Sequence, residues 1–269
     1  MAVKTDEITI KELIRKRPQD SHKGIFGTLQ FFCGSKNMTG APYLAVTGAL
    51  RCGVGLVYIS AKGFLKKTLQ TRLSEPVFCG MKISDRATAF VVGCGSGKNA
   101  RHVKSVLKQY KPAVIDADAI NYISRRKELL KTKSCDTVLT PHIMEMSRLT
   151  GKDPVYISEN REVCAAEAAK EFGSTVVLKG HETLIAAPSG EVFVNTTGNS
   201  GLSKGGSGDV LAGMIGSFLA QGYSTRDAAV ISVWLHGRAA DILADRISEH
   251  GLLPSEIPYV VAEILHDFE

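Results

Sequence analysis

The sequence of 269 residues lacks several features that would place it in particular classes of protein. It contains no apolar run long enough to cross a membrane, and residues 1–20 are too charged for a secretory signal peptide. Its six cysteines form no Cys-x-x-Cys pair and have no histidine at metal-ligand spacing, which argues against a zinc site or a disulfide framework. We therefore expect a cytoplasmic protein whose cysteines are reduced and serve as small core residues.

A large excess of charge of one sign is also missing. The chain has 33 basic and 27 acidic residues, and the small basic excess is dispersed. The densest basic clusters, at 62–67 and 125–133, are typical of solvated helix faces rather than of a nucleic-acid surface. The composition therefore predicts neither a nucleic acid nor a membrane as a partner, although a slightly basic protein suits small polyanions such as nucleotides.

Two catalytic motifs are absent as well. The phosphate-binding loop G-x-x-x-x-G-K-[ST] has no match, and its nearest approach, Gly97-Lys98, is followed by Asn99. The nucleophile elbow G-x-S-x-G would require a glycine at the position of Asp209. Any nucleotide must therefore be held by another kind of loop.

Apolar runs alternate with helical patterns along the chain, and no repeat or Pro/Ser-rich linker divides it. We expect one domain, residues 1–269, of the α/β class, with a mostly parallel sheet covered by helices on both faces. In such sheets, ligands bind at the carboxyl ends of the strands. The predicted strands are 29–33, 54–60, 88–92, 113–115, 137–139, 175–178, 183–187 and 192–194. The predicted helices are 41–52, 62–72, 99–110, 158–172, 207–221 and 225–247, with one after Pro141 and one from Pro254.

The most informative segment is a glycine-rich turn that ends in Asp209 and opens an apolar helix. The helical spacing of the apolar residues that follow predicts a helix from Ser207, with Ser207 as its N-cap. Free amides and the positive end of the helix dipole would make this turn an anion hole, formed by Gly205, Gly206, Ser207 and Gly208.

Asp209 would repel a phosphate in that turn unless it has a task. We predict that it takes a proton from a hydroxyl that then attacks the phosphorus. The helix dipole is expected to keep the carboxylate ionised at neutral pH and weakly basic. The alternative is a plain tight turn with Asp209 in the first helical turn.

Two further polar loops follow predicted strands. The loop 93–97 holds three glycines after the strand that ends at Val92, and either shapes a turn or contacts a ligand. Asp116 and Asp118 leave their strand on opposite sides, so at most one faces the ligand edge. We assign Mg²⁺ to Asp116, through bound water, whereas Asp118 is equally suited to capping the next helix.

Another pair of loops follows later strands. Thr140 is predicted as the N-cap of a helix that places His142 near the ligand edge, where it either closes a local hydrogen bond or contacts a ligand. Glu145 is expected to be its structural partner. Lys179 and Thr183 flank a turn that could clasp a phosphate or an adenosine, unless the lysine is solvated.

Taken in order along the chain, these motifs resemble those of the ADP/ATP-dependent NAD(P)H-hydrate dehydratases, which are ribokinase-like proteins. The resemblance covers nearly the full chain, from about residue 20 to His236-Gly237. It rests on Lys23-Gly24 with Gly27, Gly34-Ser35 with Thr39-Gly40-Ala41, the 93–97 loop, Asp116-Ala117-Asp118-Ala119 with Asn121, Thr140-Pro141-His142 with Glu145, Lys179-Gly180 and the segment 205–213.

The resemblance implies a three-layer αβα sandwich and the repair of NADH-hydrate and NADPH-hydrate, with phosphate taken from ADP or ATP in the presence of Mg²⁺. It also implies a homotetramer and makes Asp209 the catalytic residue. The hydrated nicotinamide nucleotide would contact Ala41, Gly95, Gly97, His142 and Asp209. The adenine nucleotide would contact Lys179, Gly180, His181, Glu182, Thr183 and Gly208.

Some positions depart from the family's usual pattern. Cys94 stands where proline is common, and Lys204 adds a cation beside the expected phosphates, which could alter nucleotide preference. The sequence assigns no arginine to the 2′-phosphate that distinguishes NADPH from NADH. Two other functions stay open: a kinase of a vitamin-precursor alcohol, of the hydroxymethylpyrimidine or thiazole type, and a non-catalytic nucleotide sensor, which would not need Asp209.

Overall fold

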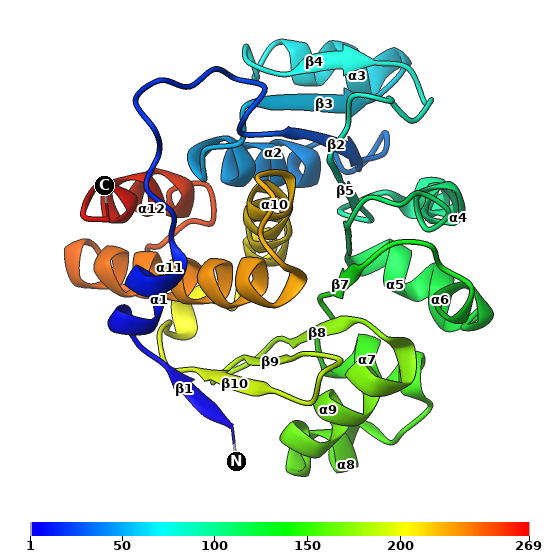
Figure 1. Ribbon diagram of the computed structural model, residues 1–269, viewed down its shortest axis with the longest axis vertical. Coiled ribbons are helices and arrows are strands. Elements are labelled where there is room, and N and C mark those ends of the chain that lie inside the picture. The colour runs from blue at the N-terminus through cyan, green and yellow to red at the C-terminus, as the bar shows by residue number, and fades with distance from the viewer. Residues whose placement is uncertain (1, 269) are drawn as a thin grey trace.

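The computed structural model of the protein describes residues 2–268, apart from the side chains of residues 98 and 99. Within this range the chain forms a ten-stranded sheet with the order β1-β10-β9-β8-β7-β6-β5-β2-β3-β4 (Figure 1). Neighbouring described strands are parallel, except that β9 is antiparallel to both β8 and β10. The strands are β1 (Val3–Thr5), β2 (Thr28–Phe32), β3 (Leu56–Ser60), β4 (Val77–Cys79), β5 (Ala89–Val92), β6 (Ala113–Ile115), β7 (Thr137–Leu139), β8 (Thr175–Leu178), β9 (Leu184–Ala186) and β10 (Val192–Asn195).

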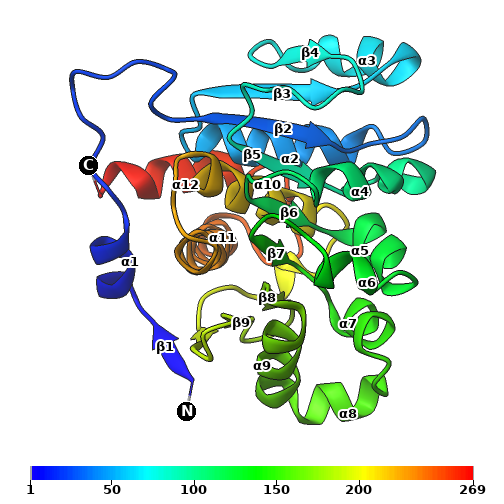
Figure 2. The same cartoon turned by 45° about the vertical axis from the view of Figure 1, so that its right-hand side comes forward.

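Helices cover both faces of the sheet, as Figures 1 and 2 show. One apolar core lies between the sheet and α2 (Gly40–Arg51), α10 (Ser207–Ala220), α11 (Thr225–Arg246) and α12 (Ile257–His266). A second core lies against α4 (Val103–Val106), α5 (Ala117–Ser124), α7 (Ile143–Thr150), α8 (Pro154–Glu159) and α9 (Arg161–Phe172). The remaining helices are α1 (Glu7–Leu13), α3 (Gly63–Gln70), α6 (Glu128–Lys131) and the 3₁₀ segments η1 (Gly97–His102) and η2 (Ser200–Leu202).

This arrangement confirms the predicted αβα layers and explains why the central strands could be recognised. Strands β5, β6, β7 and β8 are fully buried, because helices pack on both of their faces, and their sequences are apolar except for Thr137 and Thr175 at the starts of β7 and β8. Within the described residues, no helix combines the length and apolar character that a membrane crossing requires.

Several boundaries differ from the prediction. The helix expected over 158–172 is two helices, α8 and α9, because Asp153 caps a new helix at Pro154 and the backbone leaves the helical region at Asn160. The helix expected over 99–110 is the 3₁₀ segment η1 followed by the single turn α4. Strands β1 and β4 were not predicted, since each has three residues and a partly exposed pattern at the edge of the sheet.

Helix α10 carries the glycine-rich turn, and its position is fixed by close packing on α2. A Cβ built on Gly213 would lie 1.8 Å from the Ala45 carbonyl oxygen, so only glycine allows the two backbones to approach this closely. Twelve residues of α10 are buried, which agrees with the apolar sequence of this helix on nearly all of its faces. The first turn of α10 is thereby fixed at the carboxyl ends of the parallel strands.

Candidate active site

Four neighbouring strands, β5 to β8, end at the same edge of the sheet, and each is followed by a polar loop. The loops contribute the 93–97 segment, Asp116, Thr140 and Lys179 in that spatial order. Gly93 has φ +123°, and a Cβ on it would lie 1.8 Å from the Asp116 carbonyl oxygen. A glycine is therefore required where the first two loops touch.

Asp116 is the centre of a buried polar network. Its Oδ1 accepts hydrogen bonds from Thr140 Oγ1 at 2.6 Å and from Lys179 Nζ at 3.0 Å, and 3% of its side chain is exposed. Glu145 Oε2 lies 3.9 Å from the same ammonium. Burial opposes the charge on Lys179, but the Asp116 and Glu145 carboxylates outweigh it and raise the pKa of the lysine. Lys179 is thus a paired, mostly buried cation and not a solvated strand end.

Asp209 lies in the first turn of α10 and faces this network. One ligand atom from each of Asp209, Asp116 and Cys94 lies within 4.8 Å of the others, and Cys94 Sγ is 3.7 Å from Asp116 Oδ2. Burial, followed by the charge of Asp116, raises the pKa of Asp209 from 3.8 to about 7, although Lys179 and the Cys94 thiol oppose the rise. The expectation that the helix dipole keeps Asp209 acidic was therefore wrong, because desolvation and a like charge outweigh the dipole.

The glycine-rich turn opens α10 as predicted, with two differences in detail. Gly206, with φ +106°, is the N-cap, and Ser207 is the first helical residue. The Ser207 amide donates to the Lys204 carbonyl, whereas within residues 2–268 the amides of Gly205, Gly206 and Gly208 donate to no protein group. Three of the four amides predicted to form the anion hole are therefore without a protein acceptor. The Ser207 hydroxyl is buried and has no described partner.

A cavity of ≈ 870 Å³ lies beside this turn. Its wall includes every residue predicted to hold the adenine nucleotide: Lys179, Gly180, His181, Glu182, Thr183 and Gly208. The turn that carries most of them is closed by Thr183 Oγ1, which donates to the Gly180 carbonyl, and is held by Arg161, which donates to the carbonyls of His181 and Glu182. His236 Nε2 is buried on the same wall without a described partner. Unpartnered polar atoms at an open cavity suit a polar ligand.

His142 lines the same cavity but is also a structural residue. It is the N-cap of α7, in place of the predicted Thr140, and its Nδ1 accepts hydrogen bonds from the amides of Met144 and Glu145. The His142 amide in turn donates to the Glu145 carboxylate at 3.0 Å, which confirms Glu145 as a structural partner. Both interpretations of His142 therefore fit the structure.

The remaining predicted residues lie in the 93–97 loop and at the start of α2. A Cβ on Gly95 would lie 2.7 Å from the Ala41 Cβ, so the 93–97 loop packs against the start of α2. Asp118 Oδ2 accepts a hydrogen bond from the Gly97 amide at 2.7 Å and so braces the loop. Ala41, Gly95 and Gly97 are brought together there, away from the wall of the large cavity. Asp209 lies next to Gly208, which is on that wall.

Comparison with known proteins shows the family to which the chain belongs. Residues 29–261 match the NAD(P)H-hydrate dehydratase family, which is well over half of the chain. The chain belongs to this family. It is 40% identical to the ADP-dependent (S)-NAD(P)H-hydrate dehydratase of Neisseria meningitidis over 91% of the chain and 87% of that protein.

A solved structure and a longer relative extend the comparison. The ADP/ATP-dependent NAD(P)H-hydrate dehydratase of Bacillus subtilis, co-crystallised with ATP/Mg²⁺, superimposes with a TM-score of 0.91 at 30% identity, covering 100% of this chain and 99% of that one. The bifunctional NAD(P)H-hydrate repair enzyme of Moorella thermoacetica is 32% identical over 94% of the chain. This chain spans about half of that bifunctional relative's length, 53%.

Sequence reasoning missed or misread several residues of the site. The cysteines are free and mostly buried, as predicted, but Cys94 also touches the carboxylate cluster. The feature of the sequence that could have indicated this contact is the position of Cys94 in a glycine loop, where the family favours proline. Lys204 lines the cavity, yet its ammonium donates to the carbonyls of Glu249, His250 and Leu252, so it secures a neighbouring turn. No motif in the sequence indicated Arg161, because the turn that it holds, at His181 and Glu182, is 20 and 21 residues away in the chain.

Proposed function

We propose that this chain catalyses the ADP- or ATP-dependent dehydration of NADH-hydrate and NADPH-hydrate, which restores NADH and NADPH and releases phosphate. Membership of the dehydratase family and the similarity to the N. meningitidis enzyme support this activity. The observation that carries it is the environment of Asp209, a carboxyl with a pKa of about 7 that lies with Cys94 and Asp116 and next to Gly208 on the cavity wall. The proposal treats the chain as one ribokinase-like domain.

Asp209 is the general base in this proposal. A base whose pKa lies near the working pH combines a useful ionised fraction with adequate basicity. Its carboxylate removes the proton from the ring hydroxyl of the hydrate, and the hydroxyl oxygen then attacks the terminal phosphorus of ADP or ATP. In this proposal the hydrate contacts Ala41, Gly95 and Gly97, at the 93–97 loop and the start of α2, and His142 at the start of α7.

The glycine-rich turn stabilises the negative charge that develops on the transferred phosphoryl group. The amides of Gly205, Gly206 and Gly208 have no described protein acceptor and are therefore ready to donate to phosphate oxygens. The bond from phosphorus to the nucleotide breaks as the new one forms, leaving AMP from ADP or ADP from ATP. The ring nitrogen then expels inorganic phosphate to give an iminium ion, and loss of a proton from the neighbouring ring carbon to solvent restores the dihydropyridine.

The adenine nucleotide occupies the ≈ 870 Å³ cavity in this proposal, against the turn from Lys179 to Thr183. The buried and unpartnered Ser207 Oγ and His236 Nε2 supply polar atoms that a phosphate or ribose can engage. Lys179 already neutralises Asp116, so it lowers the repulsion between a phosphate and that carboxylate.

Mg²⁺ fits the residues of the cluster. Asp116 and Asp209 place carboxylate oxygens within 4.8 Å of each other, and their mutual repulsion, visible in the raised pKa of Asp209, is what a divalent cation relieves. Cys94 is unsuited to Mg²⁺, which prefers oxygen ligands. When bound, the ion would neutralise phosphate charge, held by Asp116 through water as expected from the sequence.

The family resemblance also leads us to propose a homotetramer in the cytoplasm. Light scattering on the purified chain tests the assembly, since a mass of four chains is expected and a monomer would contradict it.

The activity is tested by mixing the protein with (S)-NADH-hydrate, Mg²⁺ and either ADP or ATP. Return of the absorbance of reduced nicotinamide, with one inorganic phosphate per NADH, supports the proposal. A stable phosphorylated alcohol would identify a kinase of the same fold instead. Nucleotide binding without turnover of any alcohol would favour a sensor.

A further inference from the structure

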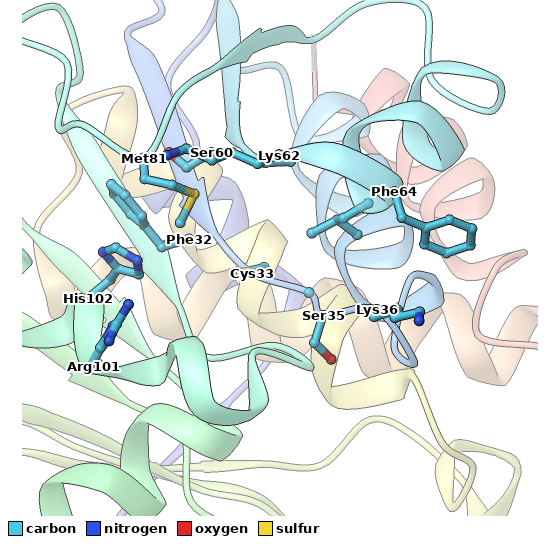
Figure 3. Close-up of a pocket in the computed structure, with 13 residues that line it drawn as sticks. Phe32, Cys33, Ser35, Lys36, Ser60, Lys62, Phe64, Met81, Arg101 and His102 are labelled. Carbon is cyan, nitrogen blue, oxygen red and sulfur yellow. The ribbon is translucent and has the colours of Figure 1, made fainter.

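A second cavity of ≈ 460 Å³ lies on the same edge of the sheet, beyond the 93–97 loop. It is formed where β2 and β3 end, where α3 begins and along η1 (Figure 3). Strands β2 and β3 follow β5 in the sheet, so this cavity adjoins the candidate active site. None of its lining residues belongs to the sets assigned to the hydrate, the nucleotide or the anion hole.

The wall of this cavity carries four basic side chains and no carboxylate: Lys36, Lys62, Arg101 and His102. Among the described residues, the two lysines and the arginine form no ion pair, although surface cations commonly find acidic neighbours in a chain with 27 acidic residues. Burial, followed by the positive charges of Arg101 and Lys62, holds the pKa of His102 below its usual value. The positive charges therefore create a positive electrostatic potential in the cavity, which favours the binding of an anion.

The other part of the wall is apolar and partly aromatic. Phe32 and His102 stack with ring centroids 5.4 Å apart and an interplanar angle of 23°. In Figure 3, Met81, Phe32, His102 and Arg101 lie together at one end of the cavity, and Ser35 and Lys36 lie at the other. An apolar surface beside cations suits a base attached to a phosphorylated sugar.

The 93–97 loop lies between this cavity and the reacting centre. The Gly34 amide donates to the Cys94 carbonyl at 2.8 Å, and a Cβ on Gly97 would lie 3.9 Å from the Ser35 side chain. Cys94 in turn belongs to the cluster with Asp209. A dinucleotide whose nicotinamide ring reaches Asp209 can therefore extend across this loop into the second cavity, while the first is left to ADP or ATP.

We infer that the second cavity binds the adenosine half of the hydrated dinucleotide and that Arg101 and Lys62 bind its 2′-phosphate, which makes NADPH-hydrate the preferred substrate. This inference rests on the proposed function. Lys36, at the end nearer the 93–97 loop, faces the diphosphate. The basic cluster at 62–67 was predicted to be only a solvated helix face, and for Lys62 the cavity revises that interpretation.

The test compares kcat/KM for NADPH-hydrate and NADH-hydrate in the wild type and in the double variant Lys62→Met/Arg101→Met, which keeps the aliphatic stems. Charge-assisted hydrogen bonds contribute about 1.5–3 kcal/mol, so kcat/KM for NADPH-hydrate should fall by roughly 10-fold or more, mainly through KM. The value for NADH-hydrate should change by less than about twofold, since its adenosine carries no 2′-phosphate. The control Lys108→Met removes an exposed cation outside both cavities and should change neither.

The possible failures are distinguishable. If the wild type turns over neither hydrate, the proposed function falls and this inference falls with it. If both hydrates are turned over and the double variant leaves their ratio unchanged, or lowers both equally, the assignment of the 2′-phosphate to Arg101 and Lys62 is overturned. Calorimetric titration with 2′,5′-adenosine diphosphate gives a second readout, since the double variant should lose binding that the wild type shows.

Discussion

The pH dependence of turnover tests the electrostatics of Asp209 directly. Its pKa of about 7 means that roughly a tenth of the protein carries the ionised base at pH 6 and roughly nine tenths at pH 8. Because a general base must be deprotonated to act, kcat/KM of the wild type should rise about tenfold between these values and then level off. At the ordinary pKa of 3.8, the carboxylate would be fully ionised throughout and the profile would be flat.

Two substitutions should move this profile in opposite directions. Asp116 raises the pKa of Asp209 and the Cys94 thiol lowers it. Asp116→Asn should therefore shift the rising limb to lower pH, whereas Cys94→Ala should shift it to higher pH. The two variants control for each other, because a general loss of structure would lower activity without shifting the limbs in opposite directions.

The assay follows the absorbance of regenerated NADH at ADP and hydrate concentrations well below their KM values, from pH 5 to pH 9. In this range kcat/KM reports the ionisation of the free enzyme. A flat wild-type profile would refute the raised pKa. Shifts of both variants in the same direction would refute the assignment of Asp116 and Cys94 as opposing influences.

Three further predictions concern stability and nucleotide binding. Because the pKa of Asp209 is higher in the folded than in the unfolded chain, ionisation destabilises the fold as pH rises from about 4 to 7. Asp209→Asn should therefore stabilise the ligand-free protein at pH 8 by up to about 4 kcal/mol and by almost nothing at pH 4, as urea denaturation would show. Gly213→Ala should cost roughly 1–3 kcal/mol in the same experiment, since its Cβ would meet the Ala45 carbonyl, and an unchanged midpoint would contradict the close packing of α10 on α2. Ser207→Ala should weaken ADP binding by about tenfold in calorimetry without lowering the stability of the ligand-free chain, because its buried hydroxyl has no protein partner; unchanged affinity would place the phosphates elsewhere.

The sequence predicted the layers of the fold because the central strands are buried on both faces. Runs such as Val176–Leu178 within β8 are apolar without interruption, and the polar loops after them could be placed on one edge by topology alone. Strands β1 and β4 carry no such pattern, since each is short and lies at an edge where one side is solvated. The break between α8 and α9 depends on the non-helical backbone conformation of Asn160, which helix propensity does not reveal.

The individual site residues could be named from their motifs, but their interactions could not. The structure places the predicted nucleotide residues on one cavity wall, while their roles stay predictions. The pairing of Lys179 with Asp116 spans 63 residues of the chain and the contact of Cys94 with Asp116 spans 22, so neither is visible in a local motif. The pKa of Asp209 follows from those neighbours and from burial, and local reasoning from the helix dipole alone gave the wrong direction.

The most direct test of the central claim is a single-turnover experiment with Asp209→Asn. The variant is mixed with (S)-NADH-hydrate, ADP and Mg²⁺, and ADP affinity is measured separately by calorimetry. If Asp209 is the base that activates the ring hydroxyl, NADH formation should slow by on the order of 10²-fold or more while ADP affinity stays within about twofold of the wild type. NADH formation at the wild-type rate would contradict the claim and remove Asp209 from the chemistry.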